Sequence, residues 1–135
     1  MSTATLSAER FRAAIERRDL DAVGELLAPD VVFHSPITFH PFTGRETVTR
    51  LLGEVAQVFE DFRYTCELTA AGAHALVFRA AVGEREIEGI DLLRFDGEGL
   101  IAEFTVLLRP LSGLVPFAQA MAERVVAAGL EPTRS

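Results

Sequence analysis

The second half of the sequence alternates between apolar and polar residues and is interrupted by short turns that contain glycine. The residues at every second position after Asp61 are Phe62, Tyr64, Cys66 and Leu68. A period of two is typical of a β-strand with one buried face. The turn signals that follow are Ala71-Gly72, Gly83 to Arg85, and Asp96 to Gly99. Strands joined by such short turns pair antiparallel, so four strands between Phe62 and Pro110 are expected to form a meander.

Helical spacing dominates the beginning of the chain. Ser7 is placed to cap a first helix that buries Phe11, and Asp19 is placed to cap a shorter second helix. Pro29 is expected to end this helical pair. Residues 31–39 are β-branched and aromatic with a break at Pro36, which is typical of a short edge strand with a bend.

Two further helices are predicted. Thr43 and Glu46 match a capping box before a third helix, and its apolar stripe is Val48, Leu51, Leu52, Val55 and Phe59. Pro110 is expected to stop the last strand. Residues 115–128 have the pattern of an amphipathic helix closed by Gly129, and residues 130–135 are expected to form a flexible tail.

This order of elements predicts an α+β fold. The length of 135 residues suits a single domain spanning residues 1–135. A curved, mostly antiparallel sheet wrapped around the long third helix forms a cone-shaped roll that buries the apolar faces, with an extra C-terminal helix. Such an arrangement leaves a pocket between the sheet and the helices.

Charge and cysteine content exclude several classes of partner. The net charge is −7 and the basic residues are scattered, so neither nucleic acid nor an anionic membrane surface is expected as a partner. The chain starts without a signal-peptide pattern and never approaches the roughly 18 apolar residues of a membrane span, which predicts a cytoplasmic protein. Cys66 is the single cysteine and is expected to be a buried structural thiol. The three histidines lack the spacing of a helical metal pair, so no metal and no cofactor is expected.

Asp91 is the strongest chemical clue in the chain. It lies in the run Ile87 to Gly97 and shares a strand face with Gly89, Leu93 and Phe95, all apolar or small. Burial disfavours the charged form of a carboxyl group and raises its pKa, which can keep the acid protonated near neutral pH. The alternative is a structural aspartate held by an arginine or by backbone donors.

Several other residues are candidates for the pocket. Phe33, Phe78, Phe95 and Phe104 are expected to supply flat apolar walls around Asp91. Tyr64 is the only tyrosine and lies on the apolar face of its strand, so its hydroxyl group either bonds Asp91 or lies in water at the rim. His40 falls in a loop expected at the mouth of the pocket, where it reaches either ligand or solvent.

The segments LAPDVVFHSPITFHPFTGRETV and GIDLLRFDGEGLIAEF resemble the nuclear transport factor 2-like superfamily over nearly the whole chain. Within it the chain is most similar to the SnoaL-like and ketosteroid isomerase-like branches. The resemblance implies the cone-shaped fold and a small apolar ligand in the cone. It leaves the activity open, because the superfamily includes isomerases, cyclases, epoxide hydrolases, dehydratases and modules that only bind or dimerise.

The resemblance to ketosteroid isomerase is partial at the level of single residues. Asp91 matches the aspartic acid that this family keeps protonated. Phe11 stands where the family has a tyrosine, and Ser35 stands where it has the basic aspartate. The carboxylate of SnoaL-like cyclases corresponds to Val106, and the Asp and Arg of epoxide hydrolases fall at Phe78 to Ala80. None of these active sites is intact.

Two hypotheses remain. The first is an enzyme of isomerase or cyclase type, in which Asp91 acts as an acid or hydrogen-bond donor, Tyr64 assists, and Phe11, Ser35, Leu93 and Val106 complete the pocket. It would act on a small hydrophobic, carbonyl-bearing molecule. The second is a non-catalytic binding or dimerisation module with a structural Asp91.

The outer face of the sheet predicts a homodimer. This face mixes apolar residues with both signs of charge, namely Val77, Arg79, Glu88, Ile90, Leu92, Arg94, Glu103, Thr105, Leu107 and Arg109. A two-fold pairing of two sheets would cover it. The terminal helix has an apolar stripe of its own and is expected to pack over the cone entrance or across the dimer.

Overall fold

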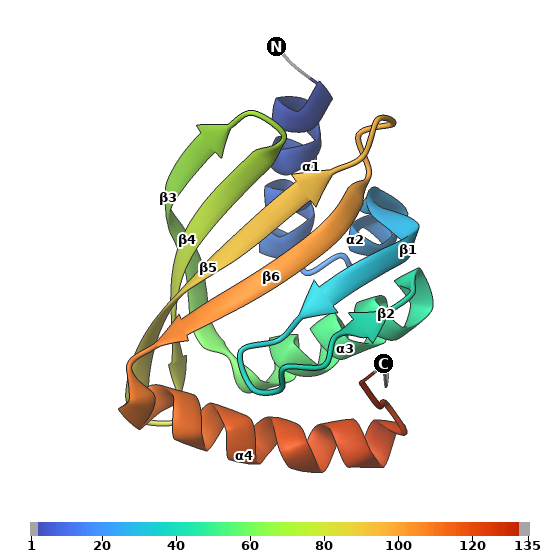
Figure 1. Ribbon diagram of the computed structural model, residues 1–135. Coiled ribbons are helices and arrows are strands. Elements are labelled where there is room, and N and C mark those ends of the chain that lie inside the picture. The colour runs from blue at the N-terminus through green and yellow to red at the C-terminus, as the bar shows by residue number, and fades with distance from the viewer. Residues whose placement is uncertain (1–2, 133–135) are drawn as a thin grey trace.

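The computed structural model describes residues 3–132 and contains four helices and six strands. In chain order they are α1 Thr3–Glu16, α2 Leu20–Leu26, β1 Leu27–His34, β2 Phe42–Thr43, α3 Arg45–Val58, β3 Glu60–Ala70, β4 Ala73–Val82, β5 Arg85–Phe95, β6 Ile101–Arg109 and α4 Leu111–Ala128. The helices α1, α2 and α3 lie on one side of the curved sheet, and α4 crosses its lower end (Figure 1).

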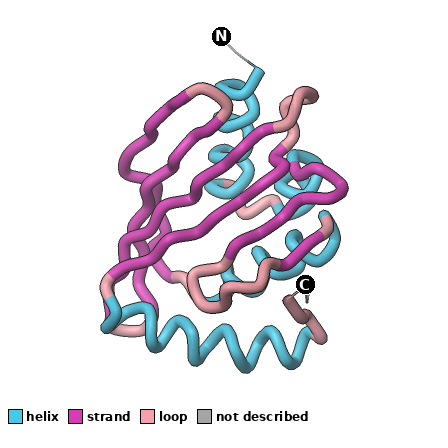
Figure 2. Tube along the Cα trace, in the orientation of Figure 1, coloured by secondary structure: helices cyan, strands magenta, loops and turns pink. Residues whose placement is uncertain are grey.

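The six strands form one sheet in the order β2-β1-β6-β5-β4-β3. The strands β3 to β6 pair antiparallel with their neighbours, which confirms the predicted meander, and β1 joins β6 in parallel. Figure 2 shows how strongly these strands curve around the helices. The predicted α+β cone with an additional C-terminal helix is confirmed.

The helix α3 packs its predicted apolar stripe against the concave face of the sheet, and Val48, Leu51 and Leu52 are buried. The predicted capping box is wrong. The N-cap is Gly44 with φ 96°, and it forms no side-chain cap bond. Because this backbone conformation favours glycine, the helix begins one residue later than the Thr43 pattern indicates.

The start of α1 also differs from its prediction. The helix begins at Thr3, so Ser7 lies inside it and does not cap it. The Ser7 hydroxyl group is buried and donates to the carbonyl oxygen of Gly99 at 2.6 Å, which ties α1 to the turn before β6. The cap predicted at Asp19 is confirmed, because its Oδ1 accepts from the backbone N–H of Ala22.

The first strand begins earlier than expected. Pro29 lies inside β1, which runs from Leu27 to His34 and starts directly after α2. β1 is not the edge strand, since the two-residue β2 pairs along its outer side. Proline is compatible with this strand because the register of β1 against β6 is broken between Leu27 and Val32.

A bulge in β3 overturns the prediction for Cys66. Tyr64 pairs with Phe78, but Cys66 pairs with Val77, so one extra residue lies between these two pairs. The insertion turns the following side chains to the opposite face. Cys66 is therefore exposed on the outer face of the sheet and is not a buried structural thiol.

The helix α4 starts at Leu111, earlier than predicted, and ends as predicted at Gly129 with φ 70°. Arg50 of α3 donates to the carbonyl oxygen of Ala128, and Arg124 pairs with Glu54 at 3.4 Å. Leu130, the first residue of the expected tail, is buried in the core. The end of that tail, residues 133–135, lies outside the described residues.

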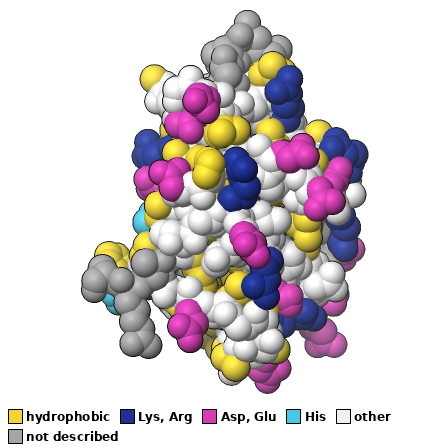
Figure 3. All heavy atoms as spheres, turned by 90° about the vertical axis from the view of Figure 1, so that its right-hand side faces the viewer, with side chains coloured by type: hydrophobic (Ala, Val, Ile, Leu, Met, Phe, Trp, Pro, Cys, Tyr) yellow, Lys and Arg dark blue, Asp and Glu magenta, His cyan; other side chains and the backbone are white. Residues whose placement is uncertain are grey.

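Acidic and basic side chains are interspersed over the face shown in Figure 3.

Within residues 3–132 no helix has both the length and the hydropathy needed to cross a bilayer.

Candidate functional site

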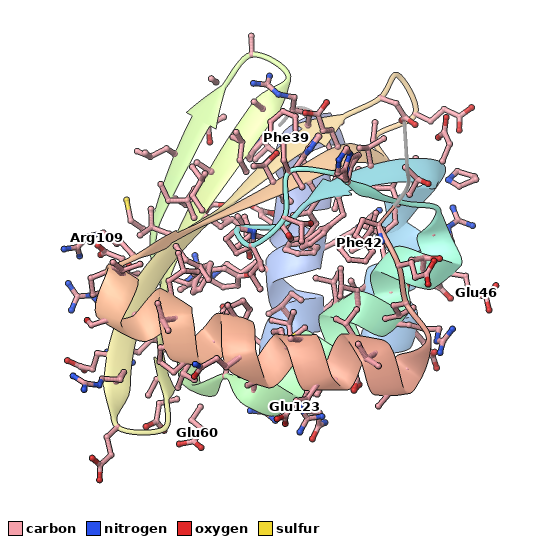
Figure 4. All side chains as sticks on the ribbon, turned by 60° about the horizontal axis from the view of Figure 1, so that its bottom comes forward. Phe39, Phe42, Glu46, Glu60, Arg109 and Glu123 are labelled. Carbon is pink, nitrogen blue, oxygen red and sulfur yellow. The ribbon has the colours of Figure 1, made fainter. Side chains whose placement is uncertain are left out.

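A cavity of about 370 Å³ lies between the concave face of the sheet and the helices. Its walls come from the end of α1, from α3 and α4, from the strands, and from the loop after β1. Most of the wall is apolar, and its aromatic members are Tyr64 and the phenylalanines Phe33, Phe42, Phe59, Phe62, Phe78, Phe104 and Phe117. Figure 4 shows α4 in front of the side chains that project between the sheet and the helices.

Asp91 supplies the buried carboxyl group of this cavity. It lies in the central strand β5, where Leu76 of β4 and Val106 of β6 are its neighbours on either side. The side chain is 6% exposed. Burial among apolar groups raises the pKa of Asp91 from 3.8 to about 7, and the hydrogen bond from Tyr64 opposes this rise.

Tyr64 is the hydrogen-bond partner of Asp91. Its hydroxyl group donates to Oδ2 of Asp91 at 2.8 Å, and both groups are buried. The ring is held by Phe62, edge to face at 5.0 Å, and by Phe78 at 6.4 Å. Burial, followed by the nearby Asp91, raises the pKa of Tyr64 well above its ordinary value. Tyr64 therefore stays protonated and acts as a donor throughout the physiological pH range.

The second oxygen of Asp91 is available to the cavity. Within the described part of the chain, Tyr64 is the one hydrogen-bond partner of the carboxyl group. Because the pKa of Asp91 is about 7, both its neutral and its ionised forms are present near neutral pH. The neutral form can donate a hydrogen bond into the cavity while Oδ2 accepts from Tyr64.

Seven of the residues named from the sequence lie on the cavity wall, namely Phe33, Ser35, Tyr64, Phe78, Asp91, Phe104 and Val106. Ser35 has a local role there. Its Oγ accepts hydrogen bonds from the backbone N–H groups of Ile37 and Thr38, at 3.3 Å and 3.1 Å. The serine thus fixes the turn of the loop that borders the cavity.

The other four residues named from the sequence, Phe11, Leu93, Phe95 and His40, do not line the cavity. Phe11 is fully buried and packs edge to face on Phe104 at 5.4 Å, on the side away from the open space. Leu93 is buried beyond Asp91 on the same strand, and Phe95 packs on His74 at 5.6 Å. Leu93 and Phe95 share the concave face of β5 with Asp91, but α1, with Phe11, packs on that end of the cone.

His40 lies outside the cavity for a different reason. Of the loop that follows β1, residues 35–38 border the cavity. His40 is exposed and packs edge to face on Phe39 at 6.4 Å. Phe39 is 95% exposed, whereas Phe42 is buried.

Several wall residues were not found from the sequence. Phe59 at the end of α3 stacks on Phe117 of α4 at 5.0 Å, and Met121 also lines the cavity. The signal was the apolar stripe of the terminal helix, which predicted a partner without identifying it. The expectation that this helix covers the cone agrees with its position. Within residues 3–132 no three His, Cys, Asp or Glu side chains are grouped to hold a metal ion.

Comparison with known proteins identifies the family. The family model described as SnoaL-like domain matches residues 8–104. No curated protein matches the chain.

Solved structures agree with this assignment. The crystal structure of a steroid delta-isomerase from Pseudomonas aeruginosa is 40% identical with a TM-score of 0.89, and 95% of each chain is covered. An uncharacterised bacterial protein with a cystatin-like fold from Silicibacter pomeroyi DSS-3 is 34% identical with a TM-score of 0.87, covering 91% of this chain and 87% of the other. A putative ketosteroid isomerase from Kribbella flavida DSM 17836 shares the fold at 21% identity, with a TM-score of 0.67 and coverage of 80% and 78%. The chain belongs to the SnoaL-like domain family and has the fold of ketosteroid isomerase-like proteins.

Proposed function

We propose that this protein binds a small, uncharged, hydrophobic molecule that carries a carbonyl group, and that neutral Asp91 donates a hydrogen bond to that carbonyl. The observation that carries the proposal is the buried bond of 2.8 Å between Tyr64 and Asp91 at the wall of a mostly apolar cavity. The pair presents one polar group to a ligand that is apolar elsewhere.

The walls support this class of ligand. Ligand cavities commonly have volumes of about 300 to 1,000 Å³, and this one measures about 370 Å³. The aromatic rings suit flat hydrocarbon surfaces. Arg18 is the one basic residue on the described wall and is exposed, so an anionic ligand would have no buried counter-ion. Similarity to a steroid delta-isomerase at 40% identity supports a ligand of steroid size.

The chemistry that such a donor supports is an isomerase- or cyclase-type reaction. A hydrogen bond to a carbonyl oxygen stabilises the negative charge that develops when a proton leaves the adjacent carbon. Tyr64 keeps Asp91 oriented by its bond to Oδ2. Ser35 and Val106 offer no carboxylate, and Asp91 cannot accept a proton while it donates to the carbonyl. The described wall therefore offers no second buried carboxylate to accept the proton that leaves the carbon.

A non-catalytic binding module is the second candidate. It is favoured by the same shortage of a base, because Glu16 and Asp19 on the wall are exposed and already engaged. In that case the cavity and Asp91 select the ligand without changing it. Binding and turnover therefore need separate measurements.

The single tyrosine allows binding to be measured directly. The chain has no tryptophan, so tyrosine fluorescence reports on Tyr64 alone. Titration with androst-4-ene-3,17-dione, a hydrophobic diketone, is expected to change the Tyr64 emission with saturation. Asp91→Leu keeps a similar volume but has no hydrogen-bond donor, so it is expected to weaken binding about tenfold, the effect of losing one hydrogen bond of about 1.4 kcal/mol. The control Asp30→Leu removes an exposed carboxylate of β1 and is expected to bind normally.

Turnover is tested with androst-5-ene-3,17-dione, whose isomerisation yields the conjugated 4-ene-3-ketone and is followed by ultraviolet absorbance. Conversion that is lost in Asp91→Leu supports the enzyme. Binding without conversion in the wild type supports the binding module. Unchanged binding in Asp91→Leu would contradict both.

The homodimer is a further part of the proposal. The outer face of the sheet carries Leu107, 52% exposed, and Leu68, 58% exposed. Glu88 lies between Arg79 and Arg109 on this face, at 3.6 Å and 3.2 Å. The mixture of apolar residues and both charge signs suits pairing with a second copy about a two-fold axis.

A further inference from the structure

Arg12 of α1 lies against the face of the Tyr64 ring. Its guanidinium carbon is 5.8 Å from the ring centroid, within the range of a cation–π interaction. Arg12 is not part of the cavity wall, and its side chain is 38% exposed. It reaches the ring from the solvent side, whereas the hydroxyl group of the same ring points to Asp91.

Two carboxylates hold the guanidinium group in this place. Nε of Arg12 lies 2.8 Å from Oε1 of Glu16, one helical turn further along α1. Nη1 lies 3.9 Å from Oε2 of Glu67 on β3. Arg12 therefore connects α1 to the strand that carries Tyr64.

β3 is held less firmly by the sheet than the inner strands are. β3 is at the edge of the sheet, and its bulge follows directly after Tyr64. An edge strand with a bulge has fewer ladder bonds to fix its side chains. Phe62 and Phe78 contact the ring from the apolar side, and Arg12 closes the exposed side.

The charges around Tyr64 come from three elements. Arg12 and Glu16 belong to α1, Glu67 to β3 and Asp91 to β5. Arg12 is the one cation among them and lowers the pKa of Tyr64, whereas Asp91 and Glu16 raise it. A phenol that is made more acidic donates a stronger hydrogen bond.

We propose that Arg12 is a positioning residue that holds the Tyr64 ring and strengthens its hydrogen bond to Asp91. The proposal rests on the proposed function of the Asp91–Tyr64 pair. Arg12 acts from outside the cavity and does not touch a ligand.

The test compares Arg12→Gln, Arg12→Lys and the wild type by carbon NMR titration of the Asp91 carboxyl group. Without Arg12 the bond from Tyr64 to the ionised carboxylate weakens, so the pKa of Asp91 rises. The expected rise in the Asp91 pKa is about half a pH unit, which corresponds to roughly 0.7 kcal/mol. Arg12→Lys retains the cation and is expected to restore part of the difference. Arg63→Gln is the matched control, because Arg63 lies on β3 but donates to the carbonyl oxygen of Asp61.

An identical titration midpoint in Arg12→Gln and the wild type would overturn the role of Arg12, even if Asp91 titrates near pH 7 in both. A wild-type midpoint near 4 would instead overturn the proposed function. In that case Tyr64 emission at pH 8 tests Arg12 alone, because donation to a carboxylate quenches tyrosine. Higher emission in Arg12→Gln than in Arg63→Gln supports the positioning role, and equal emission contradicts it.

Discussion

The hydroxyl group of Tyr64 on β3 reaches across β4 and donates to Oδ2 of Asp91 on β5, 27 positions further along the chain. Phe78 of β4, which pairs with Tyr64 on one side, pairs with Gly89 of β5 on the other, and its ring occupies the space that a Cβ atom at position 89 would need. The pair is thus a property of the folded sheet and has no counterpart in local sequence spacing.

The stability of the protein is expected to fall as the pH rises from about 4 to about 7. The pKa of Asp91 is 3.8 in the unfolded chain and about 7 in the folded one, so the folded state binds the extra proton in this range. This difference in pKa contributes about 4 kcal/mol to the free energy of unfolding at pH values below 3.8. The contribution is lost as the pH rises to the folded pKa. Asp91→Asn removes this dependence, and urea unfolding should show it to be more stable than the wild type at pH 8. If the free energy of unfolding changed with pH in the same way for the wild type and Asp91→Asn between pH 4 and 8, the prediction would be contradicted.

Tyr64→Phe is expected to raise the pKa of Asp91 further. The hydrogen bond from Tyr64 is the influence that lowers this pKa, and phenylalanine fills the same space without a donor. NMR titration of Asp91 in the variant measures the change. A midpoint at or below the wild-type value would show that the hydroxyl group does not stabilise the carboxylate.

Gly89→Ala is expected to destabilise the fold and alter the cavity. A Cβ atom there would lie 2.8 Å from the carbonyl oxygen of Leu107 and would collide with the Phe78 ring, which lines the cavity. Overpacking of this kind costs about 1 to 3 kcal/mol. Thermal or urea unfolding measures the loss, with Gly97→Ala as control because that position has no neighbouring atom within 4 Å. Equal losses in the two variants would argue against the packing explanation.

Leu107→Glu is expected to convert the proposed homodimer into a monomer. Leu107 is half exposed on the outer sheet face, and a carboxylate there would be buried without a partner in a two-fold interface. Val126→Glu places the same charge on an exposed position of α4 and should leave the dimer intact. Sedimentation velocity measures both. A monomeric wild type would remove the dimer from the proposal.

The meander, the stripe of α3 and the end of α4 could be predicted because each depends on local periodicity and turn chemistry. The outward turn of Cys66 could not, because the bulge after Tyr64 has no glycine or proline to signal it. Ser7 and Thr43 have good capping chemistry, but α1 begins at Thr3 and the N-cap of α3 is Gly44.

The sequence predicts the shared strand face of the candidate site, but not which part of that face borders the cavity. Alternation along β5 placed Asp91, Leu93 and Phe95 on one face, and this is correct. Strand periodicity carries no information about which part of that face a helix covers. The helix α1 packs on one end of the cone, so Leu93 lies in the core and Asp91 lies on the cavity wall.

The central claim is that Asp91 is a buried acid poised near neutral pH by its apolar surroundings and Tyr64. Carbon NMR titration of the Asp91 carboxyl group in the wild-type protein tests it most directly. The account predicts a midpoint of about 7, against about 3.9 for an unperturbed aspartate. A midpoint near or below the unperturbed value would contradict it.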